Sequence, residues 1–211
     1  MRLILARHGE TAGNRDRLAL GRLDIPLNET GHLQAEALAR RLQLAPLVAV
    51  YASPLRRACE TARAVAEMHN LPVEVEEGLS EMDVGEVDGL SMEKVRELYP
   101  GFLQRWLGPE VATLPMPGGE SLQEVQDRAW EAVQRIAGLH PEDIVCAVSH
   151  NFTIHVILCR ALGLPITEFR RLRHDLAAVS VLDISGDRAV LVRLNDTCHL
   201  EEQGLAERRP Y

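Results

Sequence analysis

The chain of 211 residues has a single lysine, Lys94, and only 4% aromatic residues. Its net charge at pH 7 is −8, so it lacks the positive field that non-specific nucleic-acid binding requires. No apolar run approaches the roughly 20 residues that cross a bilayer. The apolar stretch Leu3–Ala6 is too short for the core of a signal peptide. We therefore expect a cytoplasmic protein with no nucleic-acid or membrane partner.

Cysteine is also scarce. Cys59, Cys146, Cys159 and Cys198 are scattered along the chain without a CxxC pair or a zinc-type spacing. Cys146 and Cys159 fall within apolar segments, where a cysteine is usually a small core residue. The cysteines therefore predict no metal site.

Strand and helix patterns alternate along the chain. Apolar runs at 2–6, 48–52, 73–75 and 143–149 predict strands, and helical spacing predicts helices at 29–42, 53–69, from 121 onward and at 151–162. A terminal hairpin is expected from 177–184 and 188–194, joined through Ser185-Gly186-Asp187. This alternation predicts an α/β fold of three layers, with a mostly parallel central sheet and one antiparallel edge strand.

No repeat, low-complexity segment or linker divides the sequence, so residues 1–200 are predicted to form one domain. Short helices at 91–99 and 102–107, followed by a Gly/Pro-rich loop, predict a small helical insertion at about 86–120 over the active site. The apolar residues of 102–107 fit either a lid over a pocket or a contact in a homodimer. Residues 201–211 are predicted to be a polar tail.

Predicted strands end in basic or imidazole side chains. The first strand ends at Arg7 and His8, the second runs into the helix that carries Arg57, and the strand at 143–149 ends at His150. Ligands of such sheets sit at the carboxyl ends of the strands. We therefore expect two histidines and two arginines to meet at one rim.

These side chains suit phosphoryl transfer. The planar guanidinium groups of Arg7 and Arg57 can each donate to two phosphate oxygens and stabilise the charge of the transition state. A histidine can attack phosphorus when its imidazole is neutral, and nearby arginines favour that form. His8 is the candidate nucleophile, and His150 would donate to a phosphate oxygen.

The leaving alkoxide needs a proton. Glu81 follows the third predicted strand and lies between apolar neighbours, where a carboxyl group can keep its proton and serve as general acid. After the alcohol departs, the same group could activate a water molecule. Asp83 is the alternative acid in this acidic stretch.

These residues belong to longer motifs. The motifs are Arg7-His8-Gly9-Glu10-Thr11, Asn14 with Gly21–Leu27, Ser53–Ala62, Leu79–Gly89, Pro117–Ser121 and Val148–Asn151. In this order they resemble the signatures of the histidine phosphatase (phosphoglycerate mutase-like) superfamily, over nearly the whole chain up to residue 200. The compact length and the Pro117–Ser121 motif resemble its α-ribazole phosphatase and broad-specificity phosphatase branch.

The resemblance implies roles for individual residues. His8 would be the nucleophile and Glu81 the proton donor and acceptor, while Arg7, Arg57 and His150 would hold the phosphate. Asn14 would make a further phosphate contact, and Thr11, Gly21 and Asn151 complete the expected substrate-binding set. The resemblance also implies hydrolysis of a small phosphorylated metabolite through a phosphohistidine intermediate, with no metal and no cofactor.

Two other functions stay open. A cofactor-dependent phosphoglycerate mutase resembles this chain, but mutases have a longer middle insertion containing lysine and tyrosine, and a small polar residue where this chain has Leu20. A non-catalytic protein that binds a phosphorylated ligand could also keep the fold. The intact set of His8, Arg57, Glu81 and His150 argues against it, so the sequence predicts a phosphatase.

Overall fold

The computed structural model describes residues 1–186 and 188–206. In this part of the chain, six strands form one sheet in the order β3-β2-β4-β1-β5-β6. The strands are β1 (Arg2–Arg7), β2 (Leu47–Ala52), β3 (Val73–Val75), β4 (Ile144–Ser149), β5 (Val179–Ser185) and β6 (Arg188–Asp196). The first four run parallel to one another, whereas β5 runs antiparallel to both β1 and β6.

The predicted α/β class and mostly parallel sheet are confirmed. The antiparallel strand is β5, which lies one place in from the edge because β6 pairs with it on the outside. The predicted hairpin is thus an antiparallel pair at this side of the sheet. Asp187, predicted to lie in its turn, is outside the described residues.

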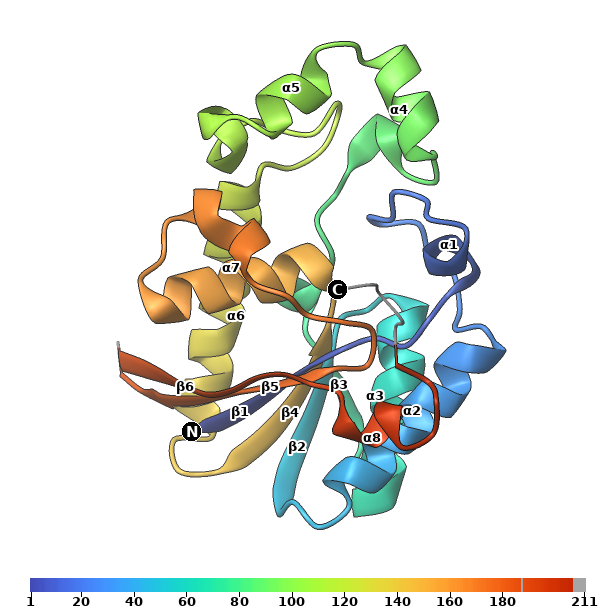
Figure 1. Cartoon of the computed structure of the whole chain (residues 1–211). Coiled ribbons are helices and arrows are strands. Elements are labelled where there is room, and N and C mark those ends of the chain that lie inside the picture. The colour runs from blue at the N-terminus through green and yellow to red at the C-terminus, as the bar shows by residue number, and fades with distance from the viewer. Residues whose placement is uncertain (187, 207–211) are drawn as a thin grey trace.

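Helices cover both faces of the sheet (Figure 1). One face carries α2 (Glu29–Leu42) and α3 (Arg56–His69), and the other carries α6 (Leu122–Leu139) and α7 (Asn151–Leu162). Side chains alternate along β1: Ile4 and Ala6 pack in the cluster with α2 and α3, while Leu3 and Leu5 pack in the opposite cluster. The sheet is therefore the middle of three layers.

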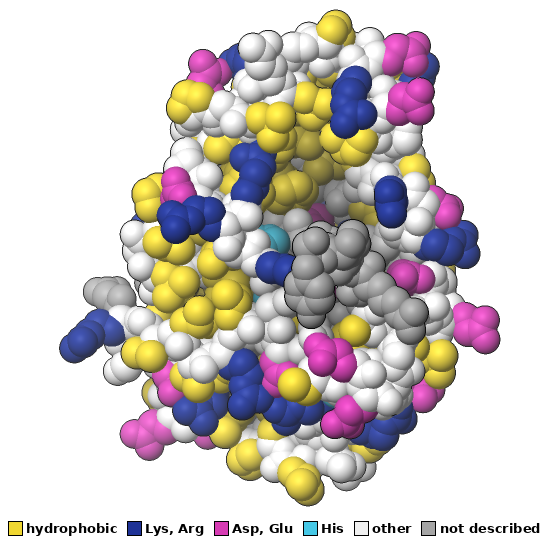
Figure 2. Space-filling view, in the orientation of Figure 1, with side chains coloured by type: hydrophobic (Ala, Val, Ile, Leu, Met, Phe, Trp, Pro, Cys, Tyr) yellow, Lys and Arg dark blue, Asp and Glu magenta, His cyan; other side chains and the backbone are white. Residues whose placement is uncertain are grey.

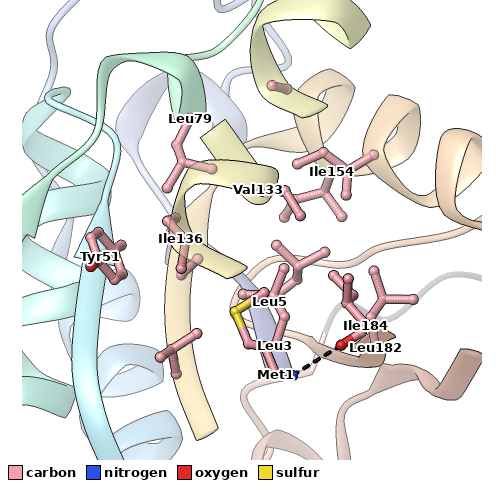
Figure 3. Close-up of a cluster of buried hydrophobic side chains, with 14 of the residues drawn as sticks. Met1, Leu3, Leu5, Tyr51, Leu79, Val133, Ile136, Ile154, Leu182 and Ile184 are labelled. Atoms are coloured by element: carbon pink, nitrogen blue, oxygen red, sulfur yellow. Dashed lines mark hydrogen bonds between the residues drawn. The ribbon is translucent and has the colours of Figure 1, made fainter. Parts of the chain in front are cut away.

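Figure 3 shows the cluster between the sheet and α6 and α7. Leu3 and Leu5 of β1 lie beside Val133 and Ile136 of α6 and Ile154 of α7, and all five side chains are buried. Complete burial of each such side chain stabilises the fold by roughly 1.5–3 kcal/mol. This packing fixes the position of β1 and therefore of His8, the residue that follows it.

Side-chain caps start several helices. The Asn28 side chain accepts from Gly31 N at the start of α2. Ser121 with Glu124 forms a capping box at the start of α6, where the sequence predicts that a helix begins. The start of α3 was predicted wrongly: it begins at Arg56, not at Ser53. Leu55 is extended, and Asp24 accepts the hydrogen bond of Arg56 N at 2.7 Å instead.

Short helices stand above the carboxyl ends of the parallel strands (Figure 1). They are α4 (Met92–Leu98), α5 (Phe102–Trp106) and the 3₁₀ turn η3 (Pro109–Ala112), within the predicted insertion. The two ends of this segment lie together: Glu86 N donates to Pro117 O and Glu120 N donates to Asp83 O, both at 2.8 Å. We call these two hydrogen-bonded ends of the insertion the clasp.

The remaining elements are short. They are α1 (Ala12–Arg15), η1 (Glu77–Leu79), η2 (Gly85–Val87), η4 (Ile166–Arg171) and α8 (Cys198–Glu201). In the predicted tail, Leu205 packs against the buried cluster of Ala37, Ala177 and Leu200, and residues 207–211 lie outside the described part. None of the described helices has the length and apolar character needed to span a membrane.

Candidate active site

The two predicted histidines lie side by side at the carboxyl ends of β1 and β4. His8 follows β1, and its N–H donates to Ser149 O of β4 at 3.0 Å, while His150 follows β4 directly. The ring centroids are 5.0 Å apart, with the planes at 54°. Both rings are buried. The parallel register therefore brings together residues 142 positions apart in the chain (150 − 8).

A cavity of about 430 Å³ lies above these strand ends. Figure 2 shows it as a hollow between the insertion and the body of the molecule. Its polar part is lined by Arg7, His8, Asn14, Arg57, Glu81 and Asn151. Three other predicted residues, Thr11, Gly21 and His150, are not among the residues that line it.

The His8 ring has a defined proton. Its Nδ1 lies 2.7 Å from Gly9 O, and since a carbonyl can only accept, Nδ1 carries the hydrogen and Nε2 has a free lone pair. Burial, followed by the charges of Arg57 and Arg7, holds the pKa of His8 well below its usual 6.5. His8 is therefore neutral at pH 7, as a nucleophilic imidazole must be.

His150 is the second neutral imidazole. Its Nε2 lies 2.7 Å from Ser53 Oγ, and its buried Nδ1 has no hydrogen-bond partner among the described residues. Burial, the nearby Arg57 and then His8 lower the pKa of His150 well below 6.5. A buried polar atom without a partner is costly. His150 Nδ1 is thus an unpaired group next to His8, where an oxyanion could satisfy it.

Arg57 is fully buried in the first turn of α3. Its Nη1 donates to Leu23 O at 2.8 Å and its Nη2 to Gly21 O at 2.7 Å, while Nε has no partner in the described part of the chain. The Asp88 carboxylate accepts from Gly21 N and Leu23 N and holds this loop in place. Gly21 therefore positions Arg57 rather than lining the cavity.

Arg7 supplies the second cation. Its Nη1 donates to His174 O at 2.7 Å, and its side chain reaches the cavity beside His8. Burial lowers the pKa of Arg57 from its usual value, but a guanidinium group stays charged at neutral pH. Two fixed positive charges therefore flank the neutral His8 ring.

Glu81 is buried, and its carboxyl group lies against the first turn of α7. Its Oε1 accepts from Met82 N at 2.9 Å and Thr153 N at 3.3 Å, and its Oε2 accepts from Phe152 N at 3.2 Å. The amides of the first turn of a helix are free donors with partial positive charge. The alternative acid, Asp83, instead accepts from Gly85 N and does not line the cavity. Of these two candidates, Glu81 is therefore the carboxyl group that a substrate in the cavity could reach.

Thr11 and Asn14 act as a pair. Thr11 N and Oγ1 both donate to Asn14 Oδ1, at 3.1 and 2.8 Å. Because Oδ1 is engaged in this way, Nδ2 is the polar group that Asn14 can present to the cavity it lines. Thr11 therefore orients Asn14. Asn151, which is the first residue of α7, also lines the cavity.

Some residues that hold the site were not assigned from the sequence. The Thr61 hydroxyl accepts from Gly9 N and donates to Arg57 O. Arg128, in the middle of α6, donates to the carbonyl oxygens of Gly78, Ser80 and Glu81. Thr61 lies within the quoted motif Ser53–Ala62, which was a usable signal, but nothing in the pattern of α6 distinguished Arg128 from a surface arginine.

Potential metal ligands are not grouped in the described residues. No three His, Cys, Asp or Glu side chains there are arranged to hold a metal ion. The positive charge beside His8 comes from Arg7 and Arg57. The expected lack of a metal or other cofactor stays a prediction.

Residues 3–197 match the family model described as the histidine phosphatase superfamily, branch 1. The chain belongs to the histidine phosphatase superfamily. It is 36% identical over 202 residues to phosphoserine phosphatase 1 of Hydrogenobacter thermophilus, a match that covers 96% of this chain and 95% of the relative. The predicted family is therefore confirmed.

Solved structures of related phosphatases share the fold. The α-ribazole phosphatase of Shigella flexneri superimposes with a TM-score of 0.85 at 29% identity, covering 93% of this histidine phosphatase and 96% of that chain. A mycobacterial glucosyl-3-phosphoglycerate phosphatase, in complex with VO3, also has a TM-score of 0.85, at 30% identity and 92% and 98% coverage. The chain is an enzyme of the phosphomonoesterase class.

Proposed function

We propose that this histidine phosphatase hydrolyses phosphomonoesters of small metabolites through a phosphohistidine intermediate, without a metal. One observation carries the proposal. His8 is neutral, has its proton fixed on Nδ1 by Gly9 O and lies in a cavity between Arg7 and Arg57. A dianionic phosphate there would meet two guanidinium groups and an imidazole nitrogen ready to attack.

In the first step, His8 Nε2 attacks phosphorus, a P–N bond forms and the P–O bond to the alcohol breaks. Arg7 and Arg57 stabilise the equatorial oxygens, and His150 Nδ1 can donate to one of them when its proton is on that nitrogen. Glu81 gives its proton to the leaving oxygen. The Nδ1–H···O=C bond to Gly9 stabilises the positive ring that results.

In the second step, water attacks the phosphohistidine. Glu81, now ionised, takes a proton from that water, the P–N bond breaks and the pair of electrons returns to His8 Nε2. Inorganic phosphate leaves, and both His8 and Glu81 return to their starting forms. One carboxyl group thus acts in turn as acid and base.

The test combines turnover with chemical trapping. We expect hydrolysis of an aryl phosphate in excess chelator, and a loss of at least about a thousandfold in His8→Ala, because the nucleophile is removed. Base-stable, acid-labile label from a ³²P-phosphate ester should appear on the wild type during rapid quench. The control His32→Ala changes an exposed histidine of α2 and should retain both signals.

Two results would overturn the proposal. Turnover that stops in chelator and returns with a divalent metal would contradict the metal-independent step. Full turnover without label on His8 would contradict the phosphohistidine. Phosphoglycerate isomerisation that depends on 2,3-bisphosphoglycerate would instead support the mutase alternative.

A further inference from the structure

Much of the active-site cavity has no part in the steps above. Beyond the polar rim, its walls come from the insertion, the loop at 18–20 and the start of α7. The insertion contributes Met92, Val95, Phe102, Leu103 and Trp106, all of them apolar. Figure 2 shows the hollow walled by hydrophobic side chains, with Lys and Arg side chains on the surface around its mouth.

Aromatic rings make up the centre of this wall. Phe102 and Trp106 stack with their centroids 5.9 Å apart and their planes at 21°, and Phe152 meets Trp106 edge-on at 6.2 Å. Phe152 N also donates to Glu81 Oε2. We call these three rings the aromatic wall. One end of the aromatic wall therefore lies next to the proposed acid, where the leaving group would depart.

Charge is distributed unevenly along the cavity. Among the described residues that line it, the cations are Arg7 and Arg57, both at the His8 end, and the anion is Glu81. A carboxylate or second phosphate held inside the cavity, away from the His8 end, would therefore lie against apolar side chains, since the Lys and Arg side chains around the mouth are on the surface. An ion moved from water to such a surface loses hydration that nothing there replaces.

We propose that the aromatic wall is the leaving-group subsite, and that it selects phosphate esters of uncharged alcohols bearing an apolar, flat group over esters of anionic alcohols. This inference rests on the proposed function, because that function places the phosphate at His8. The cavity of about 430 Å³ has room for a phosphate and a leaving group of one or two rings.

The experiment compares three esters with similar leaving-group basicity: the phosphates of 2-phenylethanol, ethanol and 3-hydroxypropionate. All are primary alkyl phosphates, so differences in kcat/KM report on the subsite rather than on the chemistry of the bond. We expect kcat/KM for the phenylethyl ester to exceed that for the 3-hydroxypropionate ester by about tenfold or more, with the ethyl ester between them.

A matched pair of leucines tests the location. Leu103 lines the cavity, whereas Leu107, at the end of the same helix, is 70% exposed and does not. Leu103→Ala should lower the preference for the phenylethyl ester several-fold, and Leu107→Ala should leave it unchanged.

Met92→Lys provides a second test, since Met92 lines the cavity but is 42% exposed, so the new charge stays partly hydrated. It should raise kcat/KM for the 3-hydroxypropionate ester several-fold.

The outcomes separate the two proposals. Equal or better turnover of the 3-hydroxypropionate ester by the wild type, with label still trapped on His8, would overturn the subsite and leave the phosphohistidine function intact. An unchanged preference in both Leu103→Ala and Met92→Lys would also overturn it. Failure of all three esters, with no label on His8, would remove the proposed function and with it the inference.

Discussion

Several histidines are buried as neutral rings near positive charge. Burial and Arg7 lower the pKa of His174 to about 3, and the same causes, with Arg57, lower those of His8 and His150. His174 is 2% exposed, and neither of its ring nitrogens has a hydrogen-bond partner in the described chain. These rings link the stability of the fold to pH, because below about pH 6.5 each takes up a proton when the chain unfolds.

His174 permits a prediction about acid stability. The pKa of an unfolded histidine is about 6.5, whereas that of folded His174 is about 3. Between these two pH values the unfolded chain binds a proton at His174 and the folded chain does not. The contribution of neutral His174 to the free energy of unfolding is therefore present above about pH 6.5 and is lost as the pH falls below that value. His174→Leu should reduce the loss of unfolding free energy between pH 6.5 and pH 5 by about 1.5 kcal/mol.

Urea unfolding at the two pH values measures this difference. His32→Leu, at an exposed position of α2, is the control and should lose as much stability as the wild type. Identical losses in His174→Leu and the wild type would contradict the neutral, buried state of His174.

Elements were predicted well where a local pattern specifies them. The apolar run of β4 and the capping box at Ser121 placed their elements correctly, because both signals lie within a few neighbouring residues. The start of α3 was misplaced because Leu55 is extended, and Asp24, far away in the sequence, accepts the hydrogen bond of Arg56 N. The contacts of Arg128 depend on long-range packing in the same way, and no local pattern contains them.

At the level of elements, Arg170 of η4 holds α5 in place. Its Nη2 donates to Trp106 O at 2.8 Å, and its guanidinium carbon lies 4.4 Å from the ring centroid of Phe169 and 5.8 Å from that of Trp106. A cation–π contact and a hydrogen bond each contribute about 1 kcal/mol. Arg170→Ala should therefore raise the amide exchange rate of α5 about tenfold or more.

Hydrogen exchange read by mass spectrometry can test this, with Arg171→Ala as the matched control. Arg171 has a side chain that is 76% exposed and pairs with Glu168. If both variants show the same exchange in α5, Arg170 does not hold that helix.

For the molecule as a whole, β1 joins the core to the site. Leu5 is fully buried between the sheet and α6 and α7, two residues before Arg7. Leu5→Ala should lower the free energy of unfolding by about 2–5 kcal/mol, because it removes buried methyl groups and leaves a cavity. Denaturant unfolding checks the value. Leu44→Ala, at a position that is 89% exposed, should change it by less than about 0.5 kcal/mol.

The candidate site was predictable at the same scale because of a general rule of parallel sheets. Strand ends gather at one edge, so His8, Arg57 and His150 could be placed together without coordinates. The positions of the protons on the histidine rings could not be predicted in this way, because they depend on single contacts such as that of His8 Nδ1 with Gly9 O. The apolar nature of the leaving-group end was also hidden, since it arises only when the insertion folds over the rim.

The clasp gives the insertion an independence that bears on how this enzyme can change. Its two ends are already joined, through Glu86 N to Pro117 O and Glu120 N to Asp83 O, so the stretch between them closes on its own base. Exchanging that stretch for one of different length would add little closure entropy, which grows only slowly with loop length. A graft between relatives at this point should thus bring a new preference for alcohols while the parent's reaction chemistry is inherited whole.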